Sequence, residues 1–159
     1  MHPIFVDVWQ DLEGAQAEAA MVEQARLRGA AVLADSDDLI ERWIYVNAVA
    51  SGIEKVYSGI EKALVRIVRD IDRHVPEGPD WHATLLRRLA RSVPDGRPSV
   101  LSPETRRRLD RLRAFRHRER NSYAGDLQPD LVLGFAAGIG ATLAAVVEDV
   151  ARFQQALKA

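Results

Sequence analysis

The residues best suited to chemistry lie close together near position 120. They are Arg116, His117, Arg120, Asn121 and Tyr123. Histidine transfers protons near neutral pH, and the guanidinium fork of arginine binds a carboxylate or a phosphate through paired hydrogen bonds. The set therefore suits either an ion-pair network with protein carboxylates or a site that binds phosphate.

The spacing places three of these residues on a helix face that begins as apolar. At about 100° per residue, Arg116, Arg120 and Tyr123 fall within about 40° of Leu109, on the side that Leu109 and Leu112 define. An arginine on such a face needs an anionic partner or a wet cleft, because an unpaired buried charge is very costly. Positions 102–120 hold eight arginines against three acidic residues, so the local charge is strongly positive.

Carboxylates that could pair with these arginines lie on a helix expected from 39 to about 74. One of its faces is apolar and predicts core: Val49, Ile53, Val56, Ile60, Leu64 and Ile67. A second face, here called the polar stripe, consists of Asn47, Ser51, Glu54, Ser58 and Glu61. The stripe is either a solvated surface or a seam that another helix or subunit approaches closely, beside Gly52 and Gly59. Glu54 and Glu61 are the natural partners for the arginines.

The remaining elements are also helical. Helices are expected at about 5–33, with a possible interruption at Gly14 or Gly29, and at 81–92, 103–123 and 129–157. Ser102 and Pro103 open the fourth of the five as N-cap and first helical residue. The chain has 159 residues, 47% of them apolar and only 6% aromatic. We predict an all-α, up-and-down bundle of four to five helices that forms a single domain over 1–159.

Composition excludes several classes of function. The chain has no cysteine, which rules out disulfides and thiolate metal sites and favours the cytoplasm. The net charge is −1, so the protein as a whole is not a general binder of polyanions. The four histidines lack metal-ligand spacing, so we expect isolated surface or packing residues, no metal and no cofactor. We expect no signal peptide, and no membrane partner because no apolar run approaches about 20 residues. Residues 131–147 predict a buried core helix in which Gly134 and Gly138 allow close helix packing.

The segment Phe-Arg-His-Arg-Glu-Arg-Asn-Ser-Tyr at 115–123 resembles the HEPN superfamily, and within it the HepT-like toxins. Their signature is Arg, four residues, His, one residue, Tyr. Arg116 and Tyr123 fill the first and last positions, and Asn121 occupies the histidine position. The resemblance extends to positions 47–62 and to Trp81-His82 with the helix that follows. It thus runs from about 35 to the C-terminus, and residues 1–35 form an N-terminal helix outside it.

The resemblance implies a HEPN-type homodimer whose motif-bearing helices meet at a cleft. It implies metal-independent endoribonuclease activity in that cleft on RNA, such as transfer or messenger RNA, with Arg116 stabilising the scissile phosphate. It also implies a minimal nucleotidyltransferase antitoxin that adds AMP to Tyr123. Arg116, His117, Arg120, Asn121 and Tyr123 are then the candidate catalytic residues, supported by the polar stripe.

Asn121 is a departure from the signature, because an amide does not transfer protons as imidazole does. His117, four residues earlier, is one candidate to replace the missing histidine. The alternative hypothesis is a catalytically degenerate HEPN module that binds nucleotides or docks a nucleotidyltransferase. The simplest hypothesis is a helical dimer whose arginines only pair with Glu54 and Glu61.

Overall fold

The computed structural model of the protein describes residues 2–121 and 127–158, and within these ranges the secondary structure is entirely helical. The elements are α1 (Ile4–Asp35), α2 (Leu39–Ile67), the π-helical turn η1 (Val68–Asp72), α3 (Trp81–Leu89), α4 (Pro103–Arg120) and α5 (Pro129–Ala156). The predicted all-α class is confirmed. The expected helix from 39 to 74 changes into the π-helical turn at Val68, and neither Gly14 nor Gly29 interrupts α1.

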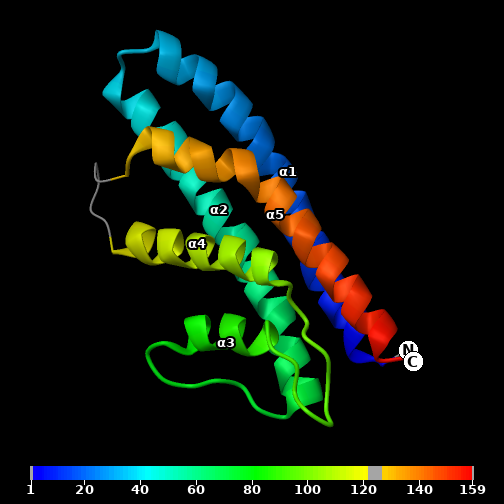
Figure 1. Ribbon diagram of the computed structural model, residues 1–159. Helices are drawn as coiled ribbons and strands as arrows, with labels where there is room; N and C mark the ends of the chain where they lie inside the picture. Colours follow the sequence, from blue (N-terminus) through cyan, green and yellow to red (C-terminus); the bar gives the residue numbers. More distant parts are fainter. Residues whose placement is uncertain (1, 122–126, 159) are drawn as a thin grey trace.

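Three long helices form the body of the molecule. Figure 1 shows α1 and α2 as an antiparallel hairpin with α5 alongside, so that the two ends of the chain lie next to each other. The shorter helices α3 and α4 lie one above the other on one side of α2. Helix α2 contacts every other helix and is the central element.

The core is built around the apolar face of α2. Its residues are almost completely buried, as the sequence predicts: Val49, Ile53, Val56, Ile60, Leu64 and Ile67. Helix α1 packs on an adjacent side of α2, where glycines allow a close approach. A Cβ atom on Gly52 would lie 2.5 Å from Cγ2 of Val22, and one on Gly59 would lie 3.1 Å from Cβ of Ala15. Gly52 and Gly59 belong to the segment Ser-Gly-Ile-Glu-Lys, which occurs at 51–55 and again at 58–62. Both glycines therefore serve packing between α1 and α2.

The start of α4 is fixed by two polar contacts. Ser102 is the N-cap, and its Oγ accepts a hydrogen bond from the backbone N of Thr105 at 3.1 Å, with Pro103 as the first helical residue. The backbone N of Ser102 donates to Oδ2 of Asp149, a buried carboxylate of α5, at 2.7 Å. The predicted cap is confirmed, and α4 is thereby anchored to the body of the bundle.

Helix α3 is held against the end of α2 by a buried ion-pair cluster. Nε of Arg97 lies 2.5 Å from Oδ1 of Asp72, and Nε of Arg88 lies 2.6 Å from Oδ2. Burial alone would raise the pKa of Asp72, but the hydrogen bonds from Arg97 and Arg88 hold that pKa below its usual value. The cluster ties α3 and the segment after it to η1, and so fixes how α3 faces α2.

Helix α5 differs from its sequence prediction. One side is buried, including Val132, Ile139 and Val146, but Gly134 and Gly138 are exposed. No described atom of another element lies within 4 Å of a Cβ built on either glycine. The prediction that another helix packs closely on these glycines was therefore wrong for the residues that the structure describes.

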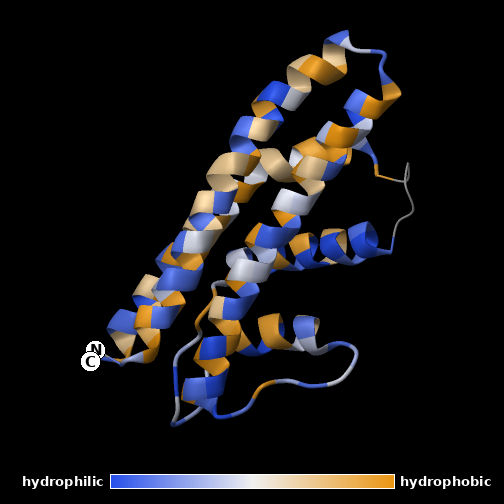
Figure 2. Ribbon diagram, turned by 180° about the vertical axis from the view of Figure 1, so that it is seen from behind, coloured by the Kyte–Doolittle hydropathy of each residue, from blue (hydrophilic) through white to orange (hydrophobic). Residues whose placement is uncertain are grey.

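Helix α5 is also more apolar over its length than we expected, since the sequence had led us to expect no apolar run that approaches the length of a membrane span. The helix is long and apolar enough to cross a membrane by length and composition, and 33% of its most apolar 18-residue stretch is buried. The core helix of a soluble protein meets the same criteria. Figure 2 shows the contrast with α4, whose residues are mostly hydrophilic.

Candidate functional site

A cationic cleft lies between the start of α3 and the second half of α4. Its volume is about 230 Å³, and its lining comprises Pro79, Asp80, His82, Ala83, Arg113, Arg116, His117 and Arg120. Three arginines and two histidines thus surround it against a single carboxylate, that of Asp80. A larger groove of about 400 Å³ between α4 and α5 contains none of the candidate residues. The cleft between α3 and α4 is therefore the candidate site.

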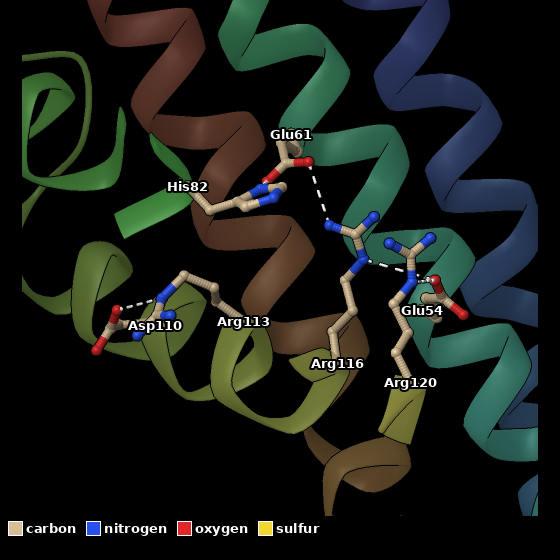
Figure 3. Close-up of polar contacts among 7 residues, drawn as sticks. All are labelled: Glu54, Glu61, His82, Asp110, Arg113, Arg116 and Arg120. Atoms are coloured by element: carbon tan, nitrogen blue, oxygen red, sulfur yellow. Dashed lines mark hydrogen bonds and ion pairs between the residues drawn. The ribbon is translucent and has the colours of Figure 1, made fainter. Parts of the chain in front are cut away.

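Arg116 is the most firmly held of the three arginines. Its side chain is only 13% exposed. Nη1 lies 3.3 Å from Oε1 of Glu61, and Nε lies 3.5 Å from Oε1 of Glu54, an ion-pair distance without a hydrogen bond. The guanidinium also lies 5.6 Å from the centre of the Tyr57 ring, within cation–π range. Figure 3 shows α4 presenting Arg116 to these carboxylates of α2.

The other two arginines are more accessible. Nε of Arg120 lies 2.7 Å from Oε1 of Glu54, while its side chain is 59% exposed. Arg113 turns to Asp110 of its own helix, with Nε 2.9 Å from Oδ1 (Figure 3). The structure thus brings Arg116 and Arg120 to the carboxylates that the sequence offered as their partners. An exposed guanidinium with a carboxylate on one side retains donors for a second anion.

His82 belongs to the same cluster, although sequence reasoning treated it as isolated. Its Nδ1 lies 2.5 Å from Oε2 of Glu61, and its ring stacks on Trp81 with the ring centres 3.7 Å apart. One signal in the sequence could have revealed it. His82 precedes the buried residues Leu85, Leu86 and Leu89 by three, four and seven positions, so it lies on the inward face of α3.

Two buried oxygen groups beside the ion pairs have altered acidity. Burial and the nearby Glu61 carboxylate raise the pKa of Tyr57, so its phenol stays neutral. Burial and the neighbouring Glu54 carboxylate raise the pKa of Glu119. Both shifts oppose further negative charge beside Glu54 and Glu61, the carboxylates that pair with the arginines.

The remaining candidates on α4 occupy different places. His117 is exposed and lines the cleft. Asn121 caps the C-terminus of α4, and its Nδ2 donates to the backbone O of His117 at 2.7 Å. The Asn121 side chain lies at the adjoining surface between α4 and the start of α5, outside the cleft. Tyr123 lies outside the described residues.

The polar stripe of α2 divides into two parts. Glu54 and Glu61 form ion pairs with the arginines of α4, whereas Asn47 and Ser51 are half-buried and form no ion pair with them. Nδ2 of Asn47 donates to the backbone O of Trp43, one turn earlier on α2, at 2.9 Å. The stripe thus meets α4 through its two glutamates.

The structure is an all-helical bundle in which the arginine-rich helix α4 pairs with Glu54 and Glu61 of α2, and this architecture is consistent with the HEPN-type domain that the sequence resembles. The comparison with protein families agrees: a family described as HepT-like protein matches residues 48–157, which is more than half of the chain. The chain belongs to this family. The searches among curated proteins and solved structures gave no significant match. The match starts somewhat later than the resemblance seen in the sequence, and α1 lies outside it.

Proposed function

We propose that the protein is a metal-independent endoribonuclease that binds RNA in the cleft between α3 and α4 and acts as the toxin of a toxin–antitoxin pair. The observation that carries this proposal is the convergence of three arginines and two histidines on one cleft. Phosphate is the anion that such a cleft recognises best, because guanidinium binds it bidentately. Transfer RNA and messenger RNA are the candidate substrates.

The chemistry needs three groups. RNA cleavage without metal requires removal of a proton from a 2′-hydroxyl, protonation of the leaving 5′-oxygen, and neutralisation of charge on the phosphorane. Arg116 suits charge neutralisation, because Glu54 and Glu61 hold its guanidinium in place before a substrate arrives. Arg120, which is largely exposed, suits an adjacent phosphate of the RNA backbone.

Family membership supports a particular form of regulation. We propose that a minimal nucleotidyltransferase adds AMP to Tyr123 and that the protein is a homodimer through its motif-bearing helices. Tyr123 follows Arg120 by three positions in the sequence. An attached AMP would add bulk and negative charge, and an arginine-rich cleft attracts negative charge.

One observation favours the second candidate function, a catalytically degenerate module that docks a nucleotidyltransferase. Asn121 stands where the family signature has histidine, and its amide hydrogen-bonds to its own helix outside the cleft. Restoring histidine by Asn121→His separates the two functions. A large gain of ribonuclease activity from an inactive wild type would support the degenerate module.

The proposed ribonuclease is tested with the purified full chain and transfer RNA in excess EDTA. We expect cleavage with 2′,3′-cyclic phosphate ends, and we expect Arg116→Ala to abolish it. Arg107→Ala is the matched control, because Arg107 is on the same helix, 60% exposed, and paired with Glu104 away from the cleft. A folded wild type that leaves RNA intact at every concentration would remove this function.

A further inference from the structure

We infer that His82 of α3 is the residue that accepts the proton from the attacking 2′-hydroxyl, in place of the histidine that the motif of α4 lacks. This inference rests on the proposed ribonuclease function. It assigns the proton transfer to a residue outside the motif-bearing helix. Glu61 is then a positioning residue that acts through the imidazole of His82.

The first support is the orientation of the imidazole. An ionised carboxylate only accepts hydrogen bonds, so Nδ1 of His82 donates its proton to Oε2 of Glu61 across 2.5 Å. The neutral ring then carries its lone pair on Nε2. No described residue hydrogen-bonds to Nε2, and the side chain lines the cleft with 30% exposure. Nε2 is therefore the ring nitrogen left to accept a proton, on a side chain that lines the site.

The second support is that one carboxylate holds both the base and a phosphate-binding group. Oε1 of Glu61 pairs with Nη1 of Arg116, while Oε2 accepts from His82. Figure 3 shows the imidazole and the guanidinium on either side of this carboxylate. A phosphate bound by Arg116 in the cleft would thus lie beside the imidazole, as a proton acceptor for its 2′-hydroxyl requires.

The other nitrogen-bearing candidates lack this arrangement. His117 also lines the cleft, but it is exposed, and no carboxylate of the described chain pairs with its ring. Asn121 has no group that accepts a proton near neutral pH. A base needs a fixed tautomer and orientation to work efficiently, and only His82 has a carboxylate that supplies both.

The proposed step is an internal rearrangement of the RNA and needs no other reactant. Nε2 of His82 takes the proton of the 2′-hydroxyl while the 2′-oxygen forms a bond to phosphorus. The bond from phosphorus to the 5′-oxygen breaks, and the 5′-oxygen leaves with a proton from water. The imidazolium of His82 then returns its proton to the hydroxide, so that no water is consumed. The products are a 2′,3′-cyclic phosphate and a 5′-hydroxyl. Arg116 neutralises the charge that develops on the phosphoryl oxygens.

The pH dependence of this step follows from the groups around His82. Glu61 faces it from α2, Asp80 lies at the start of α3, and α4 contributes Arg113, Arg116, His117 and Arg120. A free imidazole is required for the step, because only an unprotonated ring nitrogen accepts the proton of the 2′-hydroxyl. We expect the cleavage rate to rise with pH as the imidazole loses its proton, and we expect that rise to disappear when His82 is replaced.

The experiment compares single-turnover cleavage of transfer RNA in EDTA by the wild type, His82→Gln, His82→Ala, His117→Ala and His74→Ala. We expect His82→Gln to slow cleavage by about 10² to 10⁴-fold, the range of general base catalysis, with RNA affinity nearly unchanged. Added imidazole should restore activity to His82→Ala, which a purely structural role would not allow. His74 is exposed outside the cleft, so His74→Ala is the matched control and should keep full activity.

The outcomes separate this inference from the function on which it rests. If the wild type cleaves and His82→Gln cleaves equally well, His82 is not the base, although the ribonuclease assignment stands. Loss of activity in His117→Ala together with full activity in His82→Gln would assign the base to His117. A wild type that does not cleave removes both proposals. If His82→Ala unfolds, the pH profile of the isosteric His82→Gln variant decides.

Discussion

Arg116 and Glu61 form an ion pair across the contact between α4 and α2, with Nη1 3.3 Å from Oε1 and both side chains largely shielded from solvent. The same carboxylate accepts a hydrogen bond from His82 of α3. Glu61 of α2 therefore holds the guanidinium of α4 and the imidazole of α3 in fixed positions relative to each other. The arrangement requires all three helices.

The first prediction concerns this shared carboxylate. Glu61→Gln should reduce ribonuclease activity by about 10²-fold, because the amide holds the imidazole less firmly in its proton-accepting tautomer. RNA affinity should change little, since Glu54 still pairs with Arg116 and Arg120. Single-turnover kinetics and RNA titration measure the two effects separately.

Glu104→Gln is the control for that variant, because Glu104 pairs with Arg107 and Arg108 away from the cleft. It should retain wild-type activity and affinity. Equal loss of affinity and rate in Glu61→Gln would instead mean that Glu61 serves only to hold Arg116.

The second prediction compares two arginines of α4 with nearly equal exposure. Arg120 lines the cleft and its side chain is 59% exposed, whereas Arg107 lies elsewhere on the helix at 60%. Arg120→Ala should weaken RNA binding and reduce the slope of log K against log salt by about 1, as expected for one lost phosphate contact. Arg107→Ala should leave the slope unchanged. Fluorescence anisotropy over a series of salt concentrations checks both, and equal slopes would place the RNA outside the cleft.

Much of this architecture was accessible from the sequence because it depends on periodicity within one helix. The buried face of α2 from Val49 to Ile67 follows from a spacing of three and four residues. The Ser102 cap and Pro103 mark the start of α4 by local chemistry alone. Arg116 and Arg120 lie on one face of their helix, and a shielded positive charge needs an anionic partner. These two facts predicted the pairing with Glu54 and Glu61 that the structure has.

The features that sequence reasoning missed depend on how one helix faces another. The pairing of His82 with Glu61 joins residues 21 positions apart across a loop, and periodicity does not fix the orientation of α3 relative to α2. For Gly134 and Gly138 the sequence predicted a contact that is absent from the described chain. Two small residues four positions apart allow a second helix to pack closely, but they do not supply that helix. In contrast, Gly52 does meet a neighbouring helix, and only the three-dimensional arrangement distinguishes these cases.

The third prediction tests that distinction by stability. Gly52→Ala should lower the free energy of unfolding by about 1 kcal/mol, because overpacking against Val22 outweighs the higher helix propensity of alanine. Gly14→Ala, in open space on α1, should raise it by up to about 1 kcal/mol. Thermal or urea unfolding monitored by circular dichroism checks both. A stabilised Gly52→Ala would mean that α1 and α2 are less closely packed than the structure has them.

The fourth prediction concerns the carboxyl of Glu119. Burial and the neighbouring Glu54 carboxylate raise its pKa in the folded protein, so the folded state favours the protonated, neutral form. A folded-state pKa above the unfolded value means that the contribution of this group to stability is full at low pH. That contribution is lost as pH rises through the folded pKa. Glutamine resembles the neutral carboxyl at every pH.

Glu119→Gln should therefore leave the melting temperature unchanged below the usual carboxyl pKa and raise it by a few degrees at neutral pH. The gain should develop as pH rises above about 4.5, the pH near which an unfolded glutamate ionises. Melting curves of both proteins from pH 4 to 8 provide the comparison. Because the repulsion requires Glu54, the gain should shrink in a Glu54→Gln background, a double-mutant cycle that isolates the pair. A gain that is constant with pH would show that hydrogen bonding by the amide, rather than carboxylate repulsion, explains the effect.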